Sequence, residues 1–150
     1  MRIDITDTAN VKIIEKPWGW EKWIQAGDEN HKYVFKQIFL KKGFRTSLQA
    51  HRLKSETIVI LSGKGKLYTH RDKFDLDRFV NKTMSEDEVS KMLHEIEPIE
   101  IGPNSVIRIQ PHTIHRVEST EDLLYFEAST TELDDVIRIQ DDLNRPHNVV

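Results

Sequence analysis

The chain consists largely of short apolar runs separated by glycines and prolines, and this punctuation constrains its fold more than any other feature. The sequence holds six glycines and five prolines, most of them between runs rich in β-branched or aromatic residues. Such runs cover residues 32–41, 56–62, 66–70, 99–101, 106–110, 115–118 and 123–128. Many short strands joined by turns predict an all-β sandwich or barrel.

One segment departs from this pattern and predicts a helix. Ser85 is followed three residues later by Glu88, the capping-box arrangement that begins many helices. Apolar residues then recur at helical spacing, and Pro98 follows as a stop. They are Val89, Met92, Leu93 and Ile96. We predict one inserted helix over residues 86–96 that packs on the strands by a single face and leaves His94 in solvent.

Length and composition predict one domain spanning residues 1–150. Hydrophobic residues make up 37% of the chain, charged residues 31%, and the formal net charge is −3. This balance provides no basic surface for nucleic acid or an anionic membrane. The sequence has no cysteine, which excludes disulfides and thiolate chemistry, and no apolar run long enough to span a bilayer. Because the first residues lack the apolar stretch of a signal peptide, we expect a cytoplasmic protein.

Polar residues suited to metal binding stand where strand alternation predicts inward-facing side chains. Gln49 and His51 are two residues apart, so in a strand they share one face. Glu56 has the parity of the isoleucines in the run that it begins, and His115 has the parity of an apolar residue in its own run. Such groups are costly to bury without partners, and a shared divalent metal ion would satisfy them together.

The residues around these positions resemble the cupin superfamily. The first cupin motif corresponds to GFRTSLQAHRLKSETIVILSG at 43–63, and the second to IQPHTIHRV at 109–117. The resemblance is closest to the mannose-6-phosphate isomerase-like branch, which includes the C-terminal domain of mannose-1-phosphate guanylyltransferases. Features of that branch are Pro-Trp-Gly at 17–19, Ser-Leu-Gln-Ala-His at 47–51, His-Arg at 115–116, FEASTTELDDVIR at 126–138 and the stretch 142–145, so the resemblance covers residues 16–145.

The resemblance implies a cupin-type antiparallel β-barrel, or double-sheet jelly roll, with the helix inserted between the two motifs. It implies one divalent metal ion held by Gln49, His51, Glu56 and His115, for which zinc is the first expectation and manganese, iron, cobalt and nickel are alternatives. Cupins commonly pair by exchanging N-terminal strands. The alternating Ile3 and Ile5 are compatible with such a homodimer.

The function implied is metal-dependent isomerisation of a sugar phosphate. An octahedral ion with four protein ligands keeps two positions for neighbouring sugar oxygens, and it stabilises a developing oxyanion. A general base must reach the carbon that loses its proton. The candidates are Lys36, Glu127 and His70.

A phosphate group needs cations, and several lie near the motifs. Substrate binding is predicted for Arg45, Lys54 and Arg116, with Arg52 and Arg108 as further candidates. Alternation directs the side chain of Arg116 to the face of the strand away from His115, unless the strand bulges. The three tryptophans, Trp18, Trp20 and Trp23, would either stack on a sugar ring or plug one end of the barrel.

Other functions remain open at this point. A cupin of this kind would also serve as a non-catalytic metal protein that binds a sugar or nucleotide-sugar. A metal cupin oxygenase is a third reading, although such enzymes typically have histidine where Gln49 stands. A metal-free sugar epimerase is the fourth.

Overall fold

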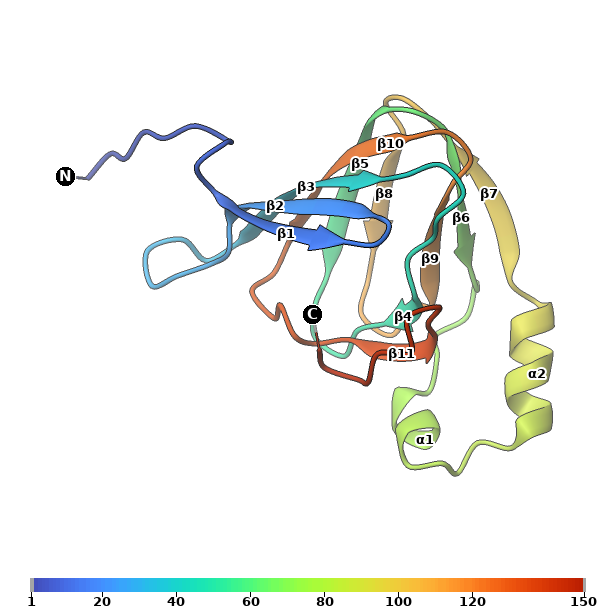
Figure 1. Cartoon of the computed structure of the whole chain (residues 1–150). Coiled ribbons are helices and arrows are strands. Elements are labelled where there is room, and N and C mark those ends of the chain that lie inside the picture. The colour runs from blue at the N-terminus through green and yellow to red at the C-terminus, as the bar shows by residue number, and fades with distance from the viewer. Residues whose placement is uncertain (1, 150) are drawn as a thin grey trace.

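The computed structural model describes residues 2–149 and forms two antiparallel sheets (Figure 1). The strands are β1 (Lys12–Lys16), β2 (Gly19–Gln25), β3 (Val34–Leu40), β4 (Leu48–Ala50), β5 (Glu56–Ser62), β6 (Gly65–Thr69), β7 (Glu97–Ile101), β8 (Val106–Ile109), β9 (His115–Ser119), β10 (Leu123–Ser129) and β11 (Ile137–Gln140). One sheet has the order β1-β2-β3-β10-β5-β8, and the other has the order β11-β4-β9-β6-β7. The all-β prediction is confirmed.

The main core lies between the two sheets and follows from strict alternation along the strands. In β3 the residues at every second position, beginning with Val34, are buried, and those between them are only partly buried. The apolar cluster contains Trp18, Ile38, Leu40, Ile58, Ile60, Leu67, Ile101, Ile107, Ile109, Val117, Leu123 and Tyr125. Twelve buried apolar side chains between the sheets give the fold a core that requires no ion.

The same inward positions become polar toward one end of the sheets. In β10, Glu127 lies directly opposite Lys36 of β3 on one side and Ile58 of β5 on the other. In the second sheet, Gln49 of β4 lies opposite His115 of β9. Directly opposed residues in an antiparallel pair present their side chains on one face. The strand registers therefore gather polar side chains at a single end of the interior.

The inserted helix α2 (Glu86–His94) is present, and it ends two residues earlier than predicted because Glu95 caps it and β7 begins at Glu97. The predicted capping box of Ser85 and Glu88 is present as well. His94 is exposed, as expected.

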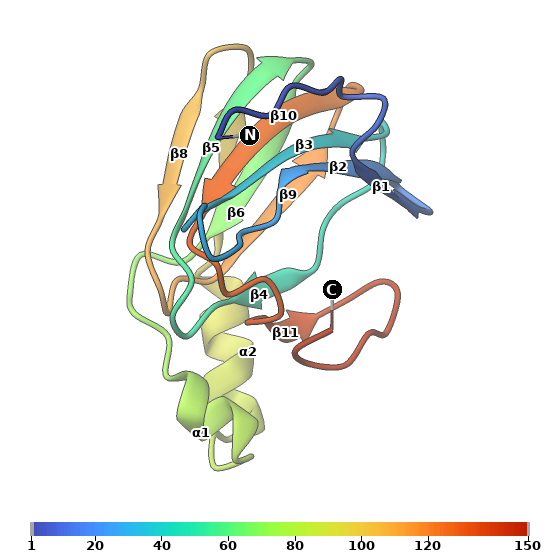
Figure 2. The same ribbon diagram turned by 90° about the vertical axis from the view of Figure 1, so that its left-hand side faces the viewer.

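The prediction of a single helix was wrong. A second helix, α1 (Leu76–Val80), precedes α2 and is capped by the side chain of Asp75, which accepts from the backbone N–H of Arg78. Five residues give no helical periodicity to detect, and α1 is stabilised by burial of Leu76. Both helices lie beside β4 and β11 (Figure 2). There Leu76 of α1 and Met92 of α2 form a second apolar cluster with Leu48, Ala50, Phe74, Ile114 and Ile137.

The N-terminal segment extends away from the sheets (Figure 1). Residues 2–11 form no strand, and Ile3 and Ile5 are 69% and 90% exposed. The exchange of this segment between two copies stays a prediction. No helix within residues 2–149 is long and apolar enough to cross a membrane.

Candidate metal centre

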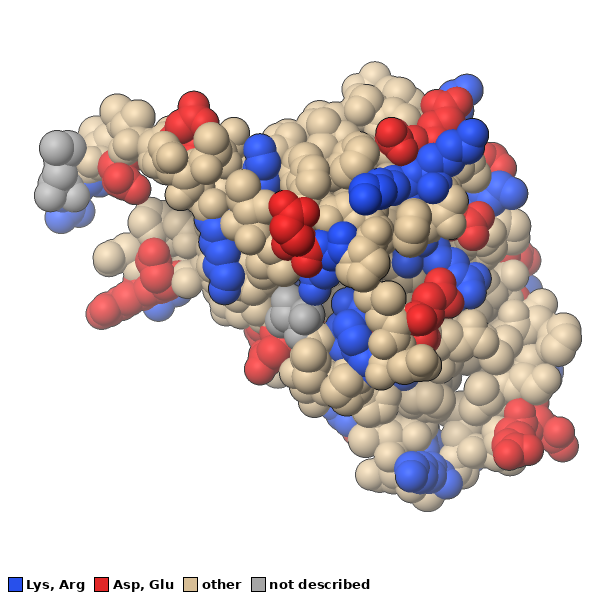
Figure 3. Space-filling model, viewed as in Figure 1, with Lys and Arg blue, Asp and Glu red and all other residues tan. Residues whose placement is uncertain are grey.

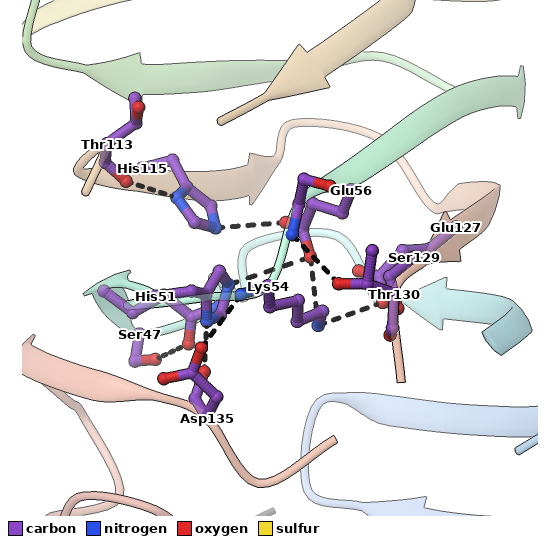
Figure 4. Close-up of polar contacts among 12 residues, drawn as sticks. Ser47, His51, Lys54, Glu56, Thr113, His115, Glu127, Ser129, Thr130 and Asp135 are labelled. Atoms are coloured by element: carbon purple, nitrogen blue, oxygen red, sulfur yellow. Dashed lines mark hydrogen bonds and ion pairs between the residues drawn. The ribbon is translucent and has the colours of Figure 1, made fainter. Parts of the chain in front are cut away.

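Three potential metal ligands converge at the polar end of the interior (Figure 4). His51 follows β4, Glu56 begins β5 and His115 begins β9. His115 Nε2 lies 3.1 Å from Glu56 Oε1, and His51 Nε2 lies 3.7 Å from Glu56 Oε2. One ligand atom from each residue lies within 4.8 Å of the other two, and all three side chains are buried. The structure thus brings together three residues that are far apart in the sequence.

The backbone orients both imidazoles. His51 Nδ1 donates to the carbonyl oxygen of Asp135 at 2.5 Å, and His115 Nδ1 donates to that of Thr113 at 2.9 Å. Because a carbonyl oxygen can only accept, each Nδ1 carries the hydrogen and each Nε2 keeps a lone pair. This arrangement resembles the outer hydrogen bonds that usually orient metal-binding histidines.

The imidazole nitrogens that face Glu56 lack hydrogen-bond partners. Within the described part of the chain, His51 Nε2 and His115 Nε2 are buried without a hydrogen bond of acceptable geometry, and Glu56 Oε2 has the ion pair with Lys54 Nζ at 3.0 Å. Each buried polar atom without a partner costs about 1–3 kcal/mol. A divalent cation would satisfy all three atoms at once. Two imidazole nitrogens and a carboxylate oxygen form a donor set that suits first-row transition metals.

The protonation states suit a cation as well. Burial by itself raises the pKa of Glu56, but the charge of Lys54 and contacts with the histidines outweigh it, so the pKa lies below its usual range. Burial lowers the pKa of His51 to about 4, and the nearby charge of His115 adds to this effect. At neutral pH, Glu56 is therefore a carboxylate and His51 a neutral imidazole, the forms that bind metal.

Gln49 lies next to this cluster. It shares one face of the sheet with His115 and lines the same cavity as His51. Its Oε1 accepts a hydrogen bond from Ser47 Oγ at 2.7 Å, which leaves a second lone pair on the amide oxygen. The role of Gln49 as a fourth ligand stays a prediction.

Two sets of buried ion pairs lie along the six-stranded sheet, to which Glu56 belongs. Lys54 Nζ lies 3.0 Å from Glu56 Oε2 and 3.5 Å from Glu127 Oε2, and Lys36 Nζ lies 3.3 Å from Glu21 Oε1. Burial lowers the pKa of Lys54, but the two carboxylates outweigh burial and raise its pKa overall. Burial and the charge of Glu56 raise the pKa of Glu127. Lys54 therefore neutralises carboxylates beside the histidine cluster.

Four of these charged side chains, those of Glu21, Lys36, Lys54 and Glu127, line a cavity of about 100 Å³. Its walls are formed by Trp18, Glu21, Lys36, Ile38, Thr46, Ser47, Gln49, His51, Lys54, Tyr125, Glu127, Leu133, Val136, Arg138 and Arg145. Of the three tryptophans only Trp18 contributes to the wall. Trp20 stacks on Phe39, and Trp23 lies against Lys36.

Two of the arginines predicted to bind substrate lie elsewhere. Arg45 pairs with Asp142 at 2.8 Å, and Arg116 donates to the carbonyl oxygen of Thr46 at 2.8 Å. Both line a separate pocket beside α2. Arg116 follows His115 in a regular strand, so alternation directs its side chain to the opposite face of the sheet.

The remaining sequence candidates also lie outside the cavity wall. His70 Nε2 lies 2.9 Å from Glu95 Oε2, at the junction of α2 and β7. Arg52 pairs with Asp77, and Arg108 is exposed on β8. The structure therefore retains Lys36 and Glu127 in the cavity and leaves His70 outside it.

Sequence reasoning missed residues of the C-terminal segment that shape the site. The carboxylate of Asp135 accepts backbone N–H bonds from Arg52, Leu53 and Lys54 at 2.7–3.1 Å. The carbonyl of the same residue holds His51. Asp135 thereby fixes the loop that presents both His51 and Lys54. The only sequence signal for it was the Asp-Asp-Val-x-Arg pattern of the resemblance.

Comparison with known proteins identifies the family. A sequence model described as mannose-6-phosphate isomerase C-terminal matches residues 4–127. No curated protein sequence matches the chain.

Several solved structures share the fold. The capsular polysaccharide assembling protein CapF from Staphylococcus aureus is 14% identical, with a TM-score of 0.62 over 87% of this chain and 34% of that chain. Oxalate decarboxylase from Lactobacillus farciminis is 13% identical, with a TM-score of 0.60 over 87% of this chain and 34% of that chain. A double-stranded β-helix protein from Klebsiella pneumoniae is 7% identical, with a TM-score of 0.60 over 89% of this chain and 95% of that chain. The chain thus spans about a third of the length of the first two.

Proposed function

The chain belongs to the mannose-6-phosphate isomerase C-terminal family, and from this premise we propose that it is a metal-dependent sugar-phosphate isomerase. The observation that carries the proposal is the convergence of His51, Glu56 and His115 beside a cavity that is lined by His51 and by the buried carboxyl group of Glu127. A divalent ion held by His51, Glu56 and His115, with Gln49 as fourth ligand, would act as a Lewis acid on the substrate oxygens.

Glu127 is the best-placed general base. It lines the cavity, and Lys54 links it to Glu56 through two ion pairs. Its raised pKa brings it nearer the working pH, which improves both uptake and return of a proton. In the reaction, the Glu127 carboxylate removes the proton from carbon 2 of the aldose and delivers it to carbon 1, while the proton of the 2-hydroxyl passes to the oxygen on carbon 1. No oxidant or reductant is needed.

Lys36 is the alternative base, and its contacts favour a supporting role. Its ammonium group lies 3.3 Å from Glu21 and 4.8 Å from the centre of the Trp23 ring. These partners occupy the nitrogen that would have to accept the substrate proton. Lys36 therefore supplies a fixed positive charge beside Glu127, its cross-strand neighbour.

The proposal is tested by loading the protein with zinc, manganese, iron, cobalt or nickel in turn and assaying a panel of aldose phosphates. We expect isomerisation with at least one metal. Glu127→Gln should lower kcat by roughly 10²–10⁴-fold while the metal stays bound. Glu118→Gln is the matched control, because Glu118 binds Tyr68 away from the cavity. Binding of sugar phosphates without turnover under every metal would contradict the proposal and favour a non-catalytic sugar-binding protein.

A further inference from the structure

Positive side chains from two distant parts of the sequence meet at the cavity. Lys36, Arg138 and Arg145 line it, and Lys16 ends β1 two residues before Trp18, which also lines it. Burial lowers the pKa of Lys16, Glu21 counteracts this, and the charges of Arg145, Arg138 and Lys36 lower it further. On the face drawn in Figure 3, Lys and Arg atoms gather where the β1–β2 hairpin meets the C-terminal segment. Residues beyond position 127, including both arginines, lie outside the stretch matched by the family.

Local carboxylates do not neutralise all of this positive charge. Glu21 pairs with Lys36, and Asp141 pairs with Arg145 through contacts of 2.9 and 3.1 Å. Lys16 forms no ion pair with any described residue. The guanidinium of Arg138 donates to backbone carbonyls of the C-terminal segment, and it lies 3.9 Å from Asp141, the carboxylate that also pairs with Arg145. These four cations share the two carboxylates of Glu21 and Asp141, which leaves an excess of positive charge on this side of the cavity. The other charged residues of the wall, Lys54 and Glu127, pair with each other.

Trp18 gives an independent indication of a ligand. Its indole is 5% exposed and lines the cavity, and its Nε1–H has no hydrogen-bond acceptor among residues 2–149. A buried donor without an acceptor is costly, and an indole N–H can only donate. An oxygen-bearing ligand in the cavity would supply the missing acceptor.

The cavity of about 100 Å³ opens to solvent, so a ligand can reach into it with one end and leave the other end at its mouth. If the sugar end lies beside His51, the phosphate lies toward the mouth. Arg145 lines the cavity with a side chain that remains 21% exposed, so it can meet a charged group there.

We infer that Arg145 and Lys16 form the phosphate subsite of the substrate and that Trp18 Nε1–H donates to one of its oxygens. The inference deepens the proposed function and rests on it for the identity of the substrate. A forked guanidinium suits a phosphate group, and an ammonium adds a point charge. Arg138 is a positioning residue, because it binds the carbonyl oxygens of Pro146 and Val149 at 2.5 Å each and so holds the segment that carries Arg145.

The first experiment measures binding of inorganic phosphate to the metal-loaded protein by titration calorimetry. Arg145→Gln and Lys16→Gln should each weaken binding by roughly tenfold, as expected for loss of a hydrogen bond to a charged group. Arg78→Gln is the matched control, because it also breaks an arginine–carboxylate pair, with Glu88 at 2.9 Å, but on α1. Unfolding temperatures of all variants show whether they fold. Phosphate affinity that is unchanged in both variants, as expected for phosphate bound only at the metal, would overturn the inference. Absence of phosphate binding to the wild type would overturn it as well.

The second experiment separates this subsite from the proposed reaction. If the isomerase is active, Arg145→Gln should raise KM for the aldose phosphate by roughly tenfold and leave the metal content unchanged. An unchanged KM would overturn the subsite while the isomerase stands. If no sugar phosphate is isomerised but phosphate binding still depends on Arg145 and Lys16, the proposed function fails and the subsite is supported.

Discussion

The two ends of the space between the sheets use the same strands for opposite purposes. In β5 the inward positions are Glu56, Ile58 and Ile60, so one strand contributes first to the histidine cluster and then to the apolar core. β3 and β10 repeat this change, with Lys36 and Glu127 at the polar end and apolar residues beyond them. The polarity of the interior thus changes along the strands while the backbone pattern stays the same.

The apolar end of the interior stabilises the folded state, whereas the polar end contributes little to its stability. Burial of large aliphatic side chains contributes about 1.5–3 kcal/mol each. Buried ions are expensive to desolvate, and their pairing only partly offsets that expense. The polar end holds five charged residues in two sets of ion pairs, Glu56–Lys54–Glu127 and Lys36–Glu21. We therefore expect the apolar end to determine folding and the polar end to determine ligand binding.

The largest expected effect is loss of the metal from the polar end. His115→Ala removes one of three converging ligands, and affinity for a divalent metal should fall by more than roughly 100-fold, since loss of an outer hydrogen bond alone costs 10–100-fold. The metal-free protein should stay folded, because the apolar end is untouched. Metal analysis after dialysis, together with thermal unfolding, measures both. His94→Ala, which changes an exposed histidine on α2, should bind metal like the wild type.

The converse change should affect folding and spare the metal. Ile60 is fully buried in the apolar cluster, and Ile60→Ala should lower the free energy of unfolding by about 2–5 kcal/mol. Metal stoichiometry of the folded variant should remain that of the wild type. Ile13→Ala is the control, because Ile13 is 42% exposed and its loss should change stability by about 0.5 kcal/mol or less. If Ile60→Ala released the metal without unfolding the chain, the two ends would not be independent.

Acid should weaken the ion pair between Asp141 and Arg145 and so destabilise the fold. Burial by itself raises the pKa of Asp141, but hydrogen bonds from Arg145 outweigh it and lower the pKa to about 2. Because the folded pKa lies below the unfolded value of about 3.9, the contribution is complete above about pH 5 and is lost as the pH falls toward 2. Asp141→Asn should therefore be less stable than the wild type by about 1–2 kcal/mol at pH 5.5. Denaturant unfolding at pH 5.5 and pH 3 should show this gap shrinking; a gap independent of pH would contradict the account.

The smallest effect concerns Gln49. Gln49→His should retain a full equivalent of metal, because imidazole replaces one neutral ligand by another. The relative affinities for zinc and manganese should shift toward zinc, which favours nitrogen ligands. Competition between the two metals measures the shift, and complete loss of metal would show that the amide has a different role.

Local rules predicted much of this molecule. Alternation and turn residues predicted the strands, and the parity of Glu56 and His115 placed both side chains in the interior, where the structure has them. Parity likewise indicated that Arg116 points away from His115. The helix α2 had both a capping box and a helical repeat, whereas the five residues of α1 had no repeat to detect.

Local sequence patterns did not predict the contacts between segments that are far apart in the chain. The bond from His51 to Asp135 joins residues 84 positions apart. Neither end of it has a local pattern that indicates the other. The same holds for Arg138 and Arg145, which reach the cavity only because the C-terminal segment folds back. Of the three cations predicted to bind substrate, Lys54 lines this cavity, whereas Arg45 and Arg116 line a separate pocket.

The central claim is that His51, Glu56 and His115 bind one divalent ion, and X-ray absorption spectroscopy of the zinc-loaded protein tests it most directly. We predict one ion per chain, with the scattering pattern of two imidazoles and with nitrogen and oxygen neighbours at about 2.0–2.2 Å. His115→Ala should remove one imidazole contribution or the ion itself. A wild-type spectrum without imidazole scattering, or a protein that binds no stoichiometric metal, would contradict the account.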